Sequence, residues 1–162
     1  MRVQRQSEGI KKGEPRNHRQ AIEFVVKWYY DNNPDSKLIP DLNWVEFYSH
    51  KFVVENKMYE SGYTSFKHKC DLVFKQITHI KGSKIENANP LIFIEIDGER
   101  HDNVATRIAD GLFDKWINET YNNLPVYRIP KYIFQNTTDD LTNEELSTIY
   151  LREFARRRGE TE

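Results

Sequence analysis

The chain has 162 residues, of which 13% are aromatic and 30% are charged, and its formal net charge is −1. This length suits a single domain with a hydrophobic core, and this composition is typical of a folded globular protein and excludes a largely disordered one. The single cysteine excludes an internal disulfide and a cysteine-rich zinc site, and no apolar run approaches the roughly 20 residues that a membrane-spanning helix needs.

The first residues, 1–14, are polar and rich in Lys and Arg and show no apolar periodicity, which predicts a flexible basic segment. They lead into no apolar stretch of the kind found in a secretory signal, so we expect an intracellular, cytoplasmic protein with no membrane partner. Basic residues gather again near residues 152–158. Basic segments of this kind either bind phosphate backbones or are simply solvated, and the sequence leaves both open.

A first helix is expected to begin at residue 15 or 16 and to end at Asp31, before the stop signal Asn32-Asn33-Pro34. Its apolar residues recur at helical spacing and are Ile22, Val25, Val26 and Tyr29. Glu23 lies among these apolar neighbours. The pattern leaves open whether its carboxylate serves a site or is solvated.

Strands are expected next, over residues 44–48, 52–55, 69–77 and 91–97. A Ser61-Gly62 turn should separate the second of these strands from the third. The last two strands are joined by a polar connection that contains Gly82 and suits a hairpin. We therefore expect them to be antiparallel neighbours, which would bring Asp71 within reach of Glu95.

A second helix is expected over Val104–Tyr121, and its apolar face consists of Ile108, Leu112, Phe113, Trp116 and Ile117. The strand that follows, 126–129, should run parallel to the strand 91–97 through this helical crossover. A last helix is expected over Leu141–Arg158, with Thr142 as its N-cap and Glu145 completing a capping box. The elements together predict an α/β fold in which residues 15–158 form a single domain, a mixed β-sheet flanked by helices, followed by a short tail at 159–162.

Two carboxylates interrupt the apolar strand 91–97 near its end, at Glu95 and Asp97. Successive side chains of a strand point to opposite faces, so these two carboxylates project from the same face. Two negative charges this close to each other repel, and a bound divalent cation would remove the repulsion. Gly98 permits a sharp exit from the strand, which would let His101 return a nitrogen to the same place. An Asp-Gly pair is also a common turn signal, so this pattern alone leaves a solvated turn open.

A third carboxylate, Asp71, lies in another apolar run, where a charge is costly unless it is used or paired. Asp71 followed by Glu95-Ile96-Asp97 resembles the pattern of the PD-(D/E)XK nuclease superfamily, in which an Asp on one strand precedes acid-x-Lys on the next. The longer string Glu95-x-Asp97-Gly98-x-x-His101 is similar to the branch related to very-short-patch repair endonucleases. The resemblance extends over about residues 18–134 and is most specific between Glu95 and His101.

This resemblance implies a restriction-endonuclease-like core and a small endonuclease that hydrolyses DNA phosphodiester bonds with Mg²⁺ or Mn²⁺ as its cofactor. It implies that Asp71 and Glu95 bind the metal ion directly, with the carbonyl oxygen of Ile96 as a third ligand. Asp97 would hold a second ion or a metal-bound water, and Glu23 matches the family's glutamate on the first helix. DNA is the partner that the resemblance implies, and a homodimer stays open.

The lysine of the family pattern falls on Asp97 in this chain, and two residues are candidates to replace it. His101 would move a proton or orient water, because the pKa of an unperturbed imidazole lies near neutrality. Lys115 would supply a positive charge at the phosphate.

Other functions remain open at this point. The absent lysine supports a catalytically inactive nuclease-fold module that binds DNA or serves assembly. A zinc hydrolase is a rival enzyme, although the sequence contains no His-x-x-x-His cluster. His68 is expected near the rim of the site, and Arg128 is expected either to meet a phosphate or to pair with an acid.

Overall fold

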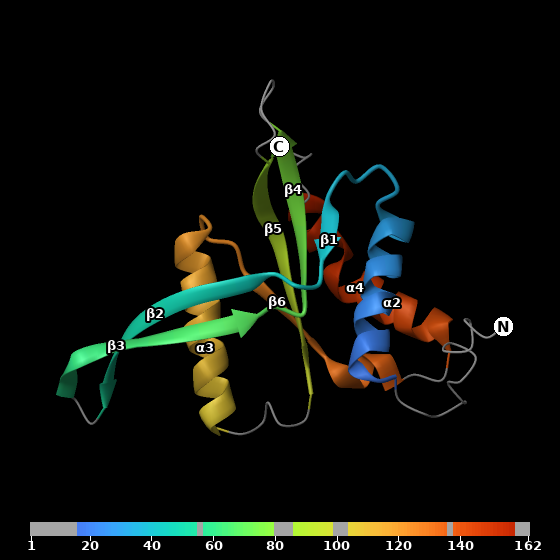
Figure 1. Cartoon of the computed structure of the whole chain (residues 1–162). Helices are drawn as coiled ribbons and strands as arrows, with labels where there is room; N and C mark the ends of the chain where they lie inside the picture. Colours follow the sequence, from blue (N-terminus) through green and yellow to red (C-terminus); the bar gives the residue numbers. More distant parts are fainter. Residues whose placement is uncertain (1–15, 55–56, 80–85, 99–103, 136–137, 158–162) are drawn as a thin grey trace.

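The computed structural model describes residues 16–54, 57–79, 86–98, 104–135 and 138–157 (Figure 1). The predicted flexible segment 1–14, the tail 159–162 and His101 lie outside the described residues. None of the described helices is both long and apolar enough to cross a membrane.

The described elements are, in chain order, α2 (His18–Asn32), β1 (Ile39–Asp41), β2 (Val45–Val54), β3 (Lys57–Lys69), β4 (Leu72–His79), β5 (Glu86–Asp97), α3 (Val104–Thr120), β6 (Val126–Pro130), the 3₁₀ helix η2 (Lys131–Gln135) and α4 (Asp139–Arg157). Strands β1, β4, β5 and β6 form one sheet in that order, and β2 pairs with β3 alone. The sheet is mixed, because β4 is antiparallel to both β1 and β5, whereas β5 is parallel to β6. The predicted α/β fold with a mixed sheet flanked by helices is therefore confirmed at this level, as are the hairpin and the parallel crossover.

Two hydrophobic clusters cover the two faces of the sheet. On one face, α2 and α4 pack against side chains of β4 and β5 such as Phe74 and Ile94. On the other face, Phe93 belongs to one cluster with Phe113 and Ile117 of α3 and Tyr48 of β2. Figure 1 shows this arrangement, with α2 and α4 on one side of the sheet and α3 and the β2–β3 pair on the other. Alternation along β5 then places Glu95 and Asp97, like Phe93, on the side of α3.

Strands β2 and β3 form a long antiparallel ribbon, and this part of the prediction was wrong. A single strand, β2, runs from Val45 to Val54 where two short strands were predicted, and the predicted Ser61-Gly62 turn lies inside β3. Pairing runs from Val45↔Lys69 to Val54↔Lys57, with a register shift between Lys51 and Val53. The cross-strand pairing outweighs the weak strand preference of the polar residues and the glycine.

The structure shifts the boundaries of two predicted strands. Lys69 ends β3, so the strand predicted over 69–77 begins only at Leu72, and β5 begins earlier than predicted, at Glu86. Cys70 lies between β3 and β4, is 1% exposed, and donates its backbone N–H to Trp44 O at 2.8 Å. This contact ties the base of the ribbon to the start of β4.

The ends of the helices depend on caps that the sequence revealed only in part. Asn17 caps α2, because its side chain accepts the Gln20 N–H at 2.8 Å while the Gln20 side chain accepts the Asn17 N–H at 2.9 Å. The predicted cap of the last helix at Thr142 was wrong. Thr138 Oγ1 accepts the Leu141 N–H at 3.2 Å, and α4 begins at Asp139, whose acidic side chain suits a helix N-terminus.

Thr142 instead serves the packing between the two helices on its face of the sheet. It is fully buried, and its hydroxyl accepts a hydrogen bond from Arg16 Nη1 at 3.1 Å. The same guanidinium donates to Phe134 O at 3.0 Å, pairs with Asp139 and lies over the Phe24 ring. Arg16 therefore fixes the start of α2 against the start of α4.

Helix α3 matches its predicted range, but its predicted apolar face was partly wrong. Phe113 and Ile117 are buried, whereas Ile108 is 61% exposed. Both buried residues lie in the C-terminal half of the helix. Asn122 and Asn123 end α3 with positive φ values of 54° and 67°, a conformation that asparagine tolerates better than most residues.

Candidate active site

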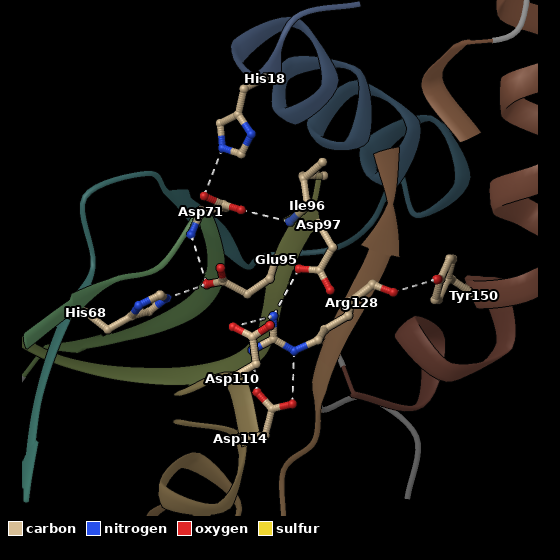
Figure 2. Close-up of polar contacts among 10 residues, drawn as sticks. All are labelled: His18, His68, Asp71, Glu95, Ile96, Asp97, Asp110, Asp114, Arg128 and Tyr150. Atoms are coloured by element: carbon tan, nitrogen blue, oxygen red, sulfur yellow. Dashed lines mark hydrogen bonds and ion pairs between the residues drawn. The ribbon is translucent and has the colours of Figure 1, made fainter. Parts of the chain in front are cut away.

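The β4–β5 hairpin brings two acidic residues together at one end of the sheet. Leu72 pairs with Ile94, so Asp71, just before β4, lies opposite Glu95 of β5. The Asp71 N–H donates to Glu95 Oε2 at 3.3 Å, and Asp71 Oδ2 accepts the Ile96 N–H at 2.7 Å (Figure 2). The prediction that these strands bring Asp71 within reach of Glu95 is confirmed.

Each carboxylate of this pair also contacts a histidine from another element. His18 Nε2 lies 2.9 Å from Asp71 Oδ1, and its side chain, on the first residue of α2, is half exposed. His68 Nε2 of β3 lies 3.1 Å from Glu95 Oε2, and its ring packs against Phe113 at a centroid distance of 4.2 Å. We call these four residues, His18, His68, Asp71 and Glu95, the acidic pair with its histidines.

Burial makes the charge of Glu95 costly. Glu95 is 6% exposed, and this desolvation raises the pKa of its carboxyl, although the hydrogen bond from His68 acts in the opposite sense. The same hydrogen bond raises the pKa of His68 above its ordinary value, against the opposing effect of burial. The two groups titrate as a pair and hold a proton more tightly than either would in water.

Glu95 keeps one oxygen directed away from this network. Its Oε2 receives both hydrogen bonds, and Oε1 accepts none from the part of the chain that the structure describes (Figure 2). A buried carboxylate oxygen without a donor is an unfavourable arrangement unless water or a cation reaches it.

Asp97 is held by a neighbouring cation. Arg128 of β6 contacts Asp97 Oδ1 through Nη1 at 3.0 Å and pairs with Asp110 and Asp114 of α3 at 3.5 and 2.7 Å. Burial opposes the guanidinium charge, but the hydrogen bond to Asp114 and the surrounding carboxylates hold the pKa of Arg128 above its ordinary value. Of the two roles expected for Arg128, the structure shows the pairing with acids.

Two predicted site residues make their contacts outside this cluster. Lys115 is on the exposed side of α3 and faces Glu119 one helical turn away at 4.0 Å, with a side chain that is 64% exposed. Glu23 is also exposed and pairs with Arg19 at 3.1 Å. The structure shows neither of them in contact with Asp71 or Glu95.

The donor set can be compared with what a hard divalent cation needs. Among the described residues, no group of three or more His, Cys, Asp and Glu side chains is spaced to hold a metal ion. Mg²⁺ nevertheless binds in many sites through one or two carboxylates, with water in its other positions. Asp71 together with the open Oε1 of Glu95 fits that smaller requirement. Ile96 touches the pair through its N–H, and the role of its carbonyl stays a prediction.

Sequence reasoning missed His18 and placed His68 only near the rim. His18 is 53 positions from Asp71, and His68 is 27 positions from Glu95. Neither histidine lies in a local motif with its carboxylate, so only the packing of α2 and the ribbon against the sheet reveals these contacts.

Comparison of the chain with protein-family models, with curated proteins and with solved structures gives no match. Arguments about function therefore rest on the residues and geometry described above.

Proposed function

We propose that this protein is a metal-dependent endonuclease that hydrolyses DNA phosphodiester bonds and that its sheet belongs to a restriction-endonuclease-like core. The observation that carries the proposal is the convergence of Asp71 and Glu95 from adjacent antiparallel strands. The buried Glu95 also has an oxygen, Oε1, that accepts no hydrogen bond from the described residues. A buried carboxyl with a raised pKa, such as that of Glu95, is typical of functional sites.

In this proposal, Asp71 and Glu95 hold Mg²⁺ or Mn²⁺, which supplies charge neutralisation at the phosphate and activation of water. His68 orients the Glu95 carboxylate through the 3.1 Å contact. The Ile96 N–H fixes the Asp71 carboxylate in the same way at 2.7 Å. These contacts keep both acids in place before the ion binds, which is what a preorganised site requires.

The second candidate function is an inactive nuclease-fold module that binds DNA or serves assembly. One observation favours it. Asp97, which occupies the position of the family lysine, is paired with Arg128, and Lys115 faces Glu119 at the surface. Among the described residues, no lysine contacts Asp71 or Glu95. This candidate needs no bound metal ion, so a test of metal dependence distinguishes it from the nuclease.

A cleavage assay tests the proposal directly. The protein is incubated with supercoiled plasmid, single-stranded DNA and branched DNA, each with Mg²⁺, Mn²⁺ or EDTA. We expect cleavage that requires the ion and falls by at least about a hundredfold in Asp71→Asn, in line with the loss of electrostatic stabilisation at other active sites.

Asp41→Asn is the matched control for this assay. The Asp41 side chain is 18% exposed, as is that of Asp71, and it accepts a hydrogen bond from Lys75 at 2.8 Å on the same sheet. It should retain the parent rate. Full activity in folded Asp71→Asn, or metal-independent cleavage by the parent, would contradict the assignment.

A further inference from the structure

His18 has no role in the mechanism proposed so far. It is the first residue of α2, and its Nε2 lies 2.9 Å from Asp71 Oδ1. Its side chain is 50% exposed, whereas that of Asp71 is 18% exposed. His18 therefore lies at the rim of the candidate site, in contact with one of the two proposed metal ligands.

The start of α2, from which His18 projects, is held firmly in place. Arg16 is buried and donates to Phe134 O at 3.0 Å and to Thr142 Oγ1 at 3.1 Å. Asn17 caps the helix. His18 follows these two residues directly, so its backbone has little freedom to move although its side chain is half exposed. A side chain on such a rigid support can hold another group in a defined position.

The chemistry of this contact shows which atom carries the hydrogen. An ionised carboxylate only accepts hydrogen bonds, so the Nε2 of His18 donates to Asp71. A ring nitrogen that carries hydrogen has no lone pair for a metal ion, so His18 does not act as a ligand through this atom. Asp71 Oδ2 accepts the Ile96 N–H at 2.7 Å, so each oxygen of Asp71 has a donor. Figure 2 shows Asp71 between His18 and Glu95, so the imidazole does not stand between the two carboxylates.

We propose that His18 is a positioning residue, which together with the Ile96 N–H fixes the orientation of the Asp71 carboxylate and so raises the affinity of the site for its metal ion. The inference rests on the proposed function, because it takes Asp71 to be a metal ligand. Hydrogen bonds to a ligating carboxylate orient it for the ion. A carboxylate that is already oriented loses less conformational freedom when the ion binds.

Calorimetric titration with Mn²⁺ tests this role. His18→Ala removes the donor and should weaken Mn²⁺ binding by about tenfold to a hundredfold. His18→Gln keeps a side-chain N–H at a similar reach and should recover most of the affinity. The melting temperatures in EDTA should stay close to that of the parent, because an exposed contact of this kind contributes little to stability. Unchanged Mn²⁺ affinity in folded His18→Ala would overturn the inference, as would equal losses in the two variants.

Arg19→Ala is the matched control. Arg19 is the next residue of α2, is 82% exposed and pairs with Glu23 at 3.1 Å, so this variant removes a contact with a carboxylate from the same turn of the helix. It should bind Mn²⁺ as the parent does. A loss equal to that of His18→Ala would trace the effect to the positive charge at the start of α2 and would overturn the role of His18.

The dependence of the cleavage rate on Mn²⁺ concentration distinguishes positioning from direct participation. Because His18 is proposed to act through Asp71, His18→Ala should need more Mn²⁺ to reach its half-maximal single-turnover rate. At saturating Mn²⁺ it should approach the rate of the parent. A rate that stays far below that of the parent at saturating Mn²⁺ would overturn the positioning role and would indicate that His18 contacts the substrate.

The inference and the proposed function can fail separately. A parent that binds Mn²⁺ and cleaves DNA, with His18→Ala equal to it in both, removes the inference alone. A parent whose Mn²⁺ affinity depends on His18 but that cleaves no DNA supports the inference and removes the nuclease function. A parent that binds no Mn²⁺ removes both.

Discussion

The contact between Glu95 and His68 should make the stability of the protein depend on pH. Both groups have a raised pKa in the folded state, Glu95 through burial and His68 through its hydrogen bond to Glu95. A raised pKa means that the folded state binds protons more tightly than the unfolded state does. Stability from such groups is complete at low pH and is lost as the pH rises through the folded-state pKa.

The metal-free protein should therefore lose unfolding free energy as the pH rises above the ordinary values of 4.5 for Glu95 and 6.5 for His68. The double variant His68→Gln/Glu95→Gln has no titrating group at this position and should lose that part of the slope. Urea unfolding at several pH values between about 5 and 8.5, with EDTA present, measures the difference. An identical pH dependence in parent and variant would show that the pair does not titrate on unfolding.

Lys115 gives a second prediction for a single side chain. Its ammonium is largely solvated and faces Glu119 at the surface of α3. Because exposed ion pairs of this kind contribute little, Lys115→Ala should fold as the parent does and should cleave DNA at a similar rate. Single-turnover rates compare the two proteins. A large loss of rate in folded Lys115→Ala would return Lys115 to the site as the replacement for the family lysine.

The ribbon is attached to α3 by a second buried carboxylate. Glu46 is 6% exposed, as is Glu95, but it accepts hydrogen bonds from Trp44 Nε1 at 2.7 Å, from Trp116 Nε1 at 3.1 Å and from Tyr121 Oη. Its partners come from the approach to β2, from α3 and from the turn after α3. Glu46 thus joins the base of the ribbon to the helix that covers the same face of the sheet.

Glu46 and Glu95 should respond differently to the same substitution. Glu46→Gln replaces an acceptor by a donor against two indoles and a phenol, and should lower the unfolding free energy by about 1.5–3 kcal/mol. Glu95→Gln should cost less in the absence of metal, because burial already disfavours the Glu95 charge. Denaturant midpoints of the two variants at neutral pH make the comparison. A larger loss in Glu95→Gln would show that its charge stabilises the metal-free fold.

The sequence predicted the elements whose pattern is strong. Helix α2, the hairpin of β4 and β5, and the parallel strand β6 follow from apolar runs, helical spacing and the handedness of crossovers. The ribbon was harder to predict, because β3 is polar, contains Gly62 and is stabilised by pairing with β2 rather than by local preference. The cap of α4 was misplaced because Thr142 has the capping-box spacing to Glu145. In the structure Thr138 caps the helix, and the Thr142 hydroxyl is used in a buried contact with Arg16.

At the scale of the whole molecule, only the parts of the candidate site that depend on local sequence patterns could be predicted. Asp71 and Glu95 could be predicted because a hairpin brings adjacent strands together. His18 comes from α2, on the opposite face of the sheet from α3, and Arg128 reaches Asp97 from β6, 31 positions away. Such contacts depend on how whole elements pack, which no local motif contains.

Metal binding at the candidate site should raise the unfolding free energy of the whole chain. An ion that binds the folded state but not the unfolded one adds RT ln(1 + [L]/Kd) to the unfolding free energy, about 2.7 kcal/mol at a hundredfold excess over Kd. Mn²⁺ should therefore raise the melting temperature of the parent.

The two aspartate variants used in the cleavage assay show whether any such stabilisation arises at Asp71. Asp71→Asn removes a charge and an oxygen ligand, so its melting temperature should respond less to Mn²⁺ than that of the parent. Asp41→Asn removes an equally buried, paired aspartate elsewhere on the sheet and should keep the full response. Thermal scans of the three proteins, each with millimolar Mn²⁺ and with EDTA, give the comparison. Equal shifts in all three would place the ion elsewhere, and no shift in the parent would favour the inactive module, because a nuclease of this kind must bind its metal ion before it can cut.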